Sequence, residues 1–128
     1  MGFWLFMLFI DLICPFTMIG FGKLFMNRAP QNINSVFGYR THMSALNLDT
    51  WEFAHKYIGK IWYLTGFITL FLSIIVIIAV FGKSNDTVET IGIIVEAVQI
   101  ILFIAAIFPT EIALRKNFDK NGKRRNTL

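Results

Sequence analysis

Two acidic residues interrupt long apolar runs and are the first candidates for chemistry. Asp11 lies in the run FIDLICPF and Glu96 lies in the run IIVEAVQI, and neither run contains a Lys or Arg. A carboxylate inside a membrane is costly unless it is protonated or paired, so such residues mark function by default. The acids indicate either a site that binds a proton, a cation or a peptide, or an adhesive contact between helices, and both interpretations stay open.

Other polar residues lie at matching positions around the two acids. Pro15 comes four residues after Asp11, so its ring displaces the helix hydrogen bond that would end on the Asp11 carbonyl. Gln99 comes three residues after Glu96 and lies on the same helix face. Hydroxyl side chains also recur every four residues in the middle apolar run. We therefore predict an intramembrane polar pocket, open to the outside, formed by Asp11, Pro15, Thr65, Thr69, Glu96 and Gln99.

The composition explains which elements must position these residues. The chain has 128 residues, of which 55% are hydrophobic and 16% charged, whereas soluble domains have about 25% charged residues. Apolar runs cover about residues 3–24, 58–81 and 91–108, each close to the roughly 20 residues with which a helix crosses a bilayer. They lack the alternation of a membrane strand. We predict an all-α membrane protein, one domain over residues 1–128, with three transmembrane helices.

The distribution of basic residues predicts the orientation. Of 12 Lys and Arg, five lie around the first connection, six lie near the C-terminus, and Lys83 alone lies in the second connection, which we expect over residues 82–90. The positive-inside rule places the N-terminus outside and the C-terminus in the cytoplasm, with loop 27–57 and the basic tail 113–128 cytoplasmic. No basic residue precedes the first span, so we expect it to remain as a span after insertion. Orientation and anionic lipid account for the positive charge without nucleic acid.

The polar stretch 34–60 separates the first two spans. Asp49 and Glu52 have the spacing of a capping box, which predicts a helix that starts near Thr50 and continues into the second span. Aromatic and basic residues from Trp51 onward, with Gly59 and Lys60, suit anchoring at the inner membrane interface.

A second group in this stretch permits an anion site. Gly38 lies in a predicted turn, and the planar guanidinium of Arg40 suits a carboxylate or phosphate. The hydroxyls of Thr41 and Ser44 either complete such a site or close local turns. We favour a structural role, in which Arg40 pairs with one of the acids at positions 49 and 52.

Enzymatic chemistry has little support in the sequence. His42 and His55 occur near the two acids of the polar stretch, but no HExxH, CxxC or nucleophile-elbow motif accompanies them. The single cysteine, Cys14, lies within a span and indicates a packing residue. We predict a protein that is not an enzyme, with no catalytic residues, no metal and no cofactor.

The polar stretch resembles the signature of the SdpI/YfhL family of small bacterial membrane proteins. The resemblance covers mainly residues 34–66, and GYRT followed by a Trp and a His at this spacing is its most specific part. The residues that carry it are Asn34, Gly38, Tyr39, Arg40, Thr41, Ser44, Asn47, Trp51, Ala54, His55, Gly59 and Lys60.

The resemblance implies a multi-pass protein of the bacterial cytoplasmic membrane, in a short three-helix form of the family. Its implied function is immunity against, or sensing of, an antimicrobial peptide toxin, without enzymatic activity. Expected partners are the lipid bilayer, a peptide toxin at the outer face, a cytoplasmic or membrane protein, and a second copy of the chain. The alternative is a small accessory subunit of a larger membrane complex such as a transporter, whose cations would pair with the two acids.

Overall fold

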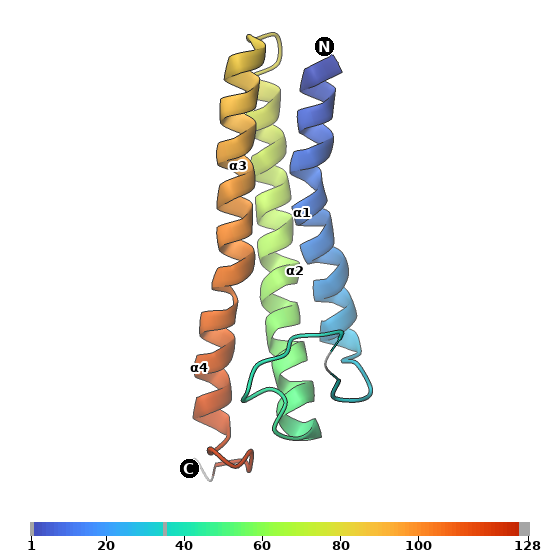
Figure 1. Cartoon of the computed structure of the whole chain (residues 1–128), viewed down its shortest axis with the longest axis vertical. Helices are drawn as coiled ribbons and strands as arrows, with labels where there is room; N and C mark the ends of the chain where they lie inside the picture. The colour runs from blue at the N-terminus through green and yellow to red at the C-terminus, as the bar shows by residue number, and fades with distance from the viewer. Residues whose placement is uncertain (1, 35, 126–128) are drawn as a thin grey trace.

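The computed structural model describes residues 2–34 and 36–125, which form four helices. Helices α1 (Gly2–Asn27), α2 (Leu48–Ala79) and α3 (Asn85–Ala105) lie side by side, and α4 (Ile107–Asn117) continues beyond the end of α3 (Figure 1). The N-terminus lies at the end with the α2–α3 connection, and the C-terminus lies at the end with the α1–α2 loop.

Three helical stretches are long and apolar enough to cross a membrane, namely Gly2–Asn27, Leu48–Ala79 and Asn85–Asn117. The prediction of an all-helical chain with three membrane-spanning stretches is therefore confirmed. Helix α2 has 32 residues and so measures about 48 Å, well beyond a hydrocarbon core of about 30 Å. Its first turns therefore extend past the predicted span and pack against the α1–α2 loop.

Helix α2 begins with a different cap from the one we predicted. Asn47 is the N-cap, and its side-chain oxygen accepts a hydrogen bond from the Thr50 backbone N–H at 2.9 Å. In return, the Thr50 hydroxyl accepts from the Asn47 backbone N–H at 3.1 Å. The predicted box of Asp49 and Glu52 is wrong, because the helix has already begun at Leu48. Asn47 and Thr50 satisfy the first amides two positions earlier in the chain.

The connection between α2 and α3 is shorter than the predicted external loop over residues 82–90. Ser84 caps α3 by accepting from the Thr87 backbone N–H at 3.2 Å, and the helix starts at Asn85. The predicted span over residues 91–108 also crosses a break at Ala106, where α3 ends and α4 begins. Pro109 lies just inside α4 and cannot donate to the preceding turn, which accounts for a break at this level.

Helices α1 and α2 pack most extensively, and glycines allow their backbones to meet. A Cβ placed on Gly22 would lie 2.6 Å from the backbone nitrogen of Tyr63, and one on Gly59 would lie 2.6 Å from the backbone nitrogen of Met26. These positions are therefore restricted to glycine by contact between helices. Gly59 is a packing residue, and the prediction that it serves as an interfacial anchor is wrong.

Replacement of Gly22 by Ala should destabilise the protein, because the new methyl group meets backbone atoms that cannot move aside. Overpacking of this kind costs about 1–3 kcal/mol. Gly20 is a matched control on the same helix, since a Cβ there has nothing within 4 Å. Thermal unfolding in lipid nanodiscs, followed by circular dichroism, should show a lower midpoint for Gly22→Ala and an unchanged or higher midpoint for Gly20→Ala. Equal midpoints for both variants would contradict this packing.

Candidate functional site

His55 is the centre of the loop-facing end of the bundle. Its imidazole is fully buried, and its Nε2 accepts a hydrogen bond from the Tyr39 backbone N–H at 2.8 Å. On the other side of the ring, Nδ1 lies 2.7 Å from the Trp51 carbonyl oxygen. A carbonyl can only accept, so Nδ1 carries the proton and Nε2 is the bare nitrogen. The two contacts together require the neutral Nδ1–H tautomer.

Aromatic rings enclose this imidazole. The ring of Phe25 on α1 contacts His55 edge-on, with centroids 4.8 Å apart, and the centroid of the Trp51 ring lies 4.3 Å from that of the imidazole. The Trp51 indole N–H in turn donates to the Pro30 carbonyl at 2.9 Å. The cluster therefore connects α1, α2 and the intervening loop.

Gly38 is required at its position for two reasons. Its φ of 114° lies in a region that other residues rarely adopt. In addition, a Cβ at this position would lie 2.7 Å from Nε2 of His55. The predicted turn at Gly38 is present, and it brings the next amide, that of Tyr39, onto the imidazole.

The hydroxyl groups of Thr41 and Ser44 are used within a local turn. The Thr41 backbone N–H donates to the Ser44 hydroxyl at 2.8 Å, and the Ser44 backbone N–H donates to the Thr41 hydroxyl at 3.2 Å. The Ser44 hydroxyl also donates to the Tyr39 carbonyl at 3.0 Å. Thr50 continues the network from α2, since its hydroxyl donates to the Ser44 carbonyl at 3.0 Å. The loop is thus fastened to the first turn of α2.

Arg40 is exposed and is not the partner of Asp49. That carboxylate instead receives a bidentate pair from Arg124, with nitrogen–oxygen distances of 2.8 and 2.9 Å. Among the described residues the ion pair of Arg124 with Asp49 is the one salt bridge, so the expected pairing of Arg40 with Asp49 or Glu52 is wrong. No local pattern in the sequence pointed to Arg124, which lies 75 residues away.

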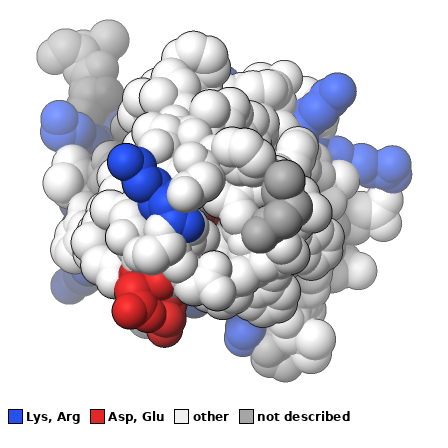
Figure 2. Space-filling view, turned by 90° about the horizontal axis from the view of Figure 1, so that it is seen from above, with Lys and Arg blue, Asp and Glu red and all other residues white. Residues whose placement is uncertain are grey.

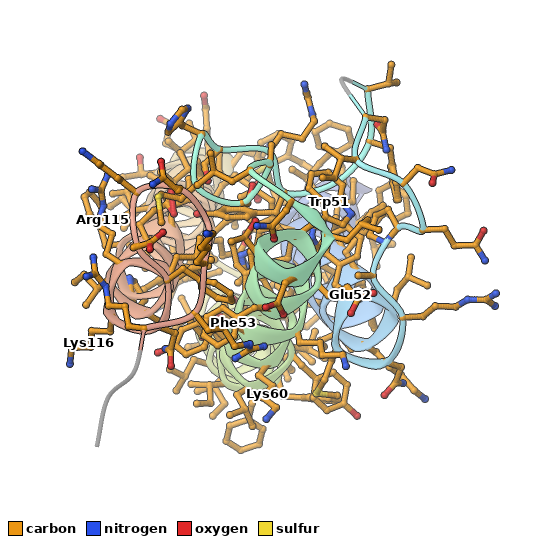
Figure 3. All side chains as sticks on the ribbon, turned by 90° about the horizontal axis from the view of Figure 1, so that it is seen from below. Trp51, Glu52, Phe53, Lys60, Arg115 and Lys116 are labelled. Atoms are coloured by element: carbon orange, nitrogen blue, oxygen red, sulfur yellow. The ribbon has the colours of Figure 1, made fainter. Side chains whose placement is uncertain are left out.

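The C-terminal segment folds back onto this end of α2. The Asn47 side-chain amide donates to the Gly122 carbonyl at 2.8 Å. Phe118 is fully buried and its ring meets that of Phe53 at 5.4 Å between centroids. Figure 3 shows Phe53 between α2 and α4, whereas Trp51 lies toward the loop and Arg115 and Lys116 point outward from α4.

Of three further motif residues, Asn34 and Lys60 have peripheral positions, whereas Tyr39 is buried. Asn34 closes a local turn by accepting from the backbone N–H groups of Val36 and Phe37 at 2.9 and 2.6 Å. Lys60 is exposed on α2. Tyr39 points its ring inward, and burial raises the pKa of its hydroxyl well above the usual range, so the group stays protonated at neutral pH. The Glu111 carboxylate on α4 also raises the pKa of that hydroxyl.

The intramembrane polar residues separate into two neighbouring groups. The Gln99 amide on α3 donates to the Asp11 carbonyl at 2.8 Å and to the Ser73 hydroxyl at 2.7 Å. Pro15 is buried in α1 and leaves that carbonyl free, so the amide occupies the acceptor that the proline releases. The Glu96 carboxyl group on α3 is a neighbour of the Asp11 carboxyl group.

Thr65 and Thr69 belong to the second group. The Thr69 hydroxyl donates to the Thr65 carbonyl at 2.6 Å within α2. Both threonines line a groove of about 470 Å³ between α2 and α3, to which Ser73 and Gln99 also contribute and whose remaining lining residues are apolar. Asp11 is fully buried in the helix packing, away from this groove. The predicted pocket thus consists of a buried acidic cluster and a groove, and Gln99 and Ser73 belong to both.

Within the described part of the chain, no three His, Cys, Asp or Glu side chains come together in a way that could hold a metal ion. His42 is exposed on the loop, whereas His55 is buried with both ring nitrogens in use. The two histidines thus form no common site with the neighbouring acids.

The SdpI/YfhL protein family matches residues 31–110, a range that includes the loop, α2 and α3. The chain belongs to the SdpI/YfhL family. Comparisons with curated proteins and with solved structures gave no significant match. The family match extends well past residue 66, so the helices as well as the polar loop carry the relationship.

Sequence reasoning missed several residues that build this SdpI/YfhL motif cluster. Thr50 had a detectable signal, because an Asn followed three residues later by Thr is itself a capping pattern. Phe25 and Pro30 had none, since their contacts with His55 and Trp51 depend on how α1 returns to α2. Gly122 could be recognised only from the fold.

Replacement of His55 by Leu should destabilise the loop-facing end, because the buried Tyr39 N–H and Trp51 carbonyl lose a partner. An unpaired buried polar group costs about 1–3 kcal/mol. His55→Gln should lose less stability, since its side-chain amide can replace one of the two hydrogen bonds. His42→Leu is the control, because that residue is exposed.

Thermal unfolding and hydrogen exchange at the Tyr39 amide measure these effects. We expect His55→Leu to be the least stable variant, followed by His55→Gln, with His42→Leu close to the wild-type chain. Unchanged protection of the Tyr39 amide in His55→Leu would contradict the assignment.

Proposed function

We propose that this SdpI/YfhL family member is a non-enzymatic immunity or receptor-type protein of the bacterial cytoplasmic membrane, which protects against or senses an antimicrobial peptide. The observation that carries the proposal is the family match over residues 31–110. That match includes the loop motif, in which both ring nitrogens of His55 and the hydroxyls of Thr41 and Ser44 have hydrogen-bond partners inside the protein. Such a cluster suits a fixed structural element or partner surface better than a catalytic centre.

The α2–α3 groove supports contact with an apolar peptide. Its lining is formed by Leu, Ile and Val side chains, with Thr65, Thr69 and Ser73 on the α2 wall and Gln99 on the α3 wall. A peptide segment that enters the bilayer could bury apolar side chains there and find hydroxyl partners. Helix α2 is continuous from this wall to His55, so displacement of the helix by a bound peptide would reach the loop cluster.

The proposed orientation places the N-terminus outside and the loop cluster in the cytoplasm. Basic residues surround the loop and the C-terminal segment, as the positive-inside rule requires for a cytoplasmic face. The opposite end, seen in Figure 2, is mostly uncharged. In this arrangement a secreted peptide meets the groove and the outer helix ends, and the loop cluster faces an intracellular partner.

Cysteine accessibility tests the orientation. In a Cys14→Ser background, a membrane-impermeant maleimide should label Asn85→Cys in intact cells and label Lys120→Cys only after the membrane is opened. Both positions are exposed, so access depends on the side of the membrane. Labelling of Lys120→Cys in intact cells, with Asn85→Cys protected, would reverse the orientation.

Growth in the presence of secreted antimicrobial peptides tests the function. Deletion should lower the inhibitory concentration of the cognate peptide, and the wild-type chain should restore it. Thr69→Phe fills the groove and should restore resistance only in part. If about 1.4 kcal/mol of binding free energy is lost, the inhibitory concentration should be roughly tenfold below that of the wild-type chain. Leu64→Phe is the matched control, since Leu64 is exposed on α2 outside the groove.

Immunoblots of membranes should show equal amounts of both variants. Unchanged sensitivity after deletion, across the peptides of the producing strain, would contradict the immunity role. If the chain then copurified with a larger transporter in mild detergent, an accessory-subunit role would replace it.

A further inference from the structure

We propose that Asp11 and Glu96 form an intramembrane proton-binding site in which the two carboxyl groups share one proton. The site is independent of the proposed peptide role and rests on the contact between α1 and α3. Asp11 has no exposed surface, and Glu96 is close enough for a hydrogen bond between the two carboxyl groups when one of them carries a proton.

The unpaired oxygen atoms show that the site lacks a hydrogen-bond donor. Among the described residues, both carboxyl oxygens of Asp11 and Oε2 of Glu96 are buried without a hydrogen-bond partner. Two carboxylates have no proton to donate to each other, so as a pair of anions they would leave all of these oxygens unsatisfied. One proton placed between them supplies the missing donor.

Gln99 is an independent sign that a donor belongs here. This side chain is only 1% exposed, and its amide nitrogen is already bonded to the Asp11 carbonyl and the Ser73 hydroxyl. Its oxygen Oε1 is buried without a partner among the described residues. The cluster therefore contains more buried acceptors than donors, which disfavours two ionised carboxylates beside Gln99.

Among the described residues, no basic side chain lies within the apolar stretches to neutralise two negative charges. The sequence has no Lys, Arg or His in residues 3–22, 61–79 or 84–105. Cys14 on α1 is the other titratable group near Glu96, and α2 contributes only the neutral Ser73. Two adjacent charges in a low-dielectric interior repel strongly, and a single shared proton halves the net charge of the pair.

The packing keeps the two acids together. Gly92 on α3 faces α1, and a Cβ there would meet the Met7 side chain and lie 3.4 Å from Oδ2 of Asp11. The missing side chain lets α3 approach the buried acid closely. Glu96 is only partly buried, so it is the member of the pair through which the proton exchanges.

Infrared spectroscopy of the protein in lipid nanodiscs at neutral pH tests the site. The carbonyl stretch of a protonated carboxyl group, identified by its shift in D₂O, should report one such group per chain. Asp11→Asn and Glu96→Gln should each abolish the band, because an amide can donate to the remaining carboxylate in place of the proton. Glu89→Gln, an exposed position on α3, should leave the band unchanged.

The alternatives give different spectra once circular dichroism shows equal helix content. Loss of half the band in each single variant would mean two independently protonated acids and would overturn the shared proton. Absence of the band in the wild-type chain would mean two carboxylates and would also overturn it. A band that weakens when Na⁺ replaces choline at constant pH would assign the site to a metal cation instead.

Discussion

The hydrogen bond from the Tyr39 backbone N–H to Nε2 of His55 holds the loop-facing end of this protein together. It joins residues 16 positions apart and fixes the imidazole in its neutral form, because the other ring nitrogen must donate to a carbonyl. The conformation of Gly38, the tilted ring contact of Trp51 and the edge contact of Phe25 all position one of these two partners. Without this bond, the loop would present a buried amide with no acceptor, which is a costly state.

Helix α2 connects that cluster with the membrane interior. Its first turns carry Trp51 and His55, its middle meets α1 through Gly59, and its later turns form the groove wall and contribute Ser73 to the buried polar cluster. The α1–α2 pair is therefore the rigid part of the bundle. Helix α3 approaches it less extensively and leaves a groove open, so the ligand-facing and acidic features both depend on where α3 lies.

Sequence reasoning succeeded where one physical requirement dominated. Apolar length alone predicted the three membrane-spanning stretches, and the position of Pro15 relative to Asp11 indicated a free carbonyl, which Gln99 occupies. The motif spacing led to the SdpI/YfhL family.

Local rules failed where two similar patterns overlapped. Asn47–Thr50 and Asp49–Glu52 are both plausible caps, and the contact of Asn47 with Gly122 favours the first. Residue spacing could not predict contacts between distant parts of the chain. Arg124 meets Asp49 only because the C-terminal segment folds back onto α2. Gly59 meets the backbone of α1 only because of how the two helices pack.

The tautomer of His55 tests the central claim most directly. In protein labelled with ¹⁵N-histidine and held in lipid nanodiscs, NMR should show a protonated Nδ1 and an unprotonated Nε2 at neutral pH, with a coupling across the hydrogen bond from the Tyr39 amide. A protonated Nε2, or a Tyr39 amide that exchanges with solvent as fast as an exposed loop amide, would contradict the account.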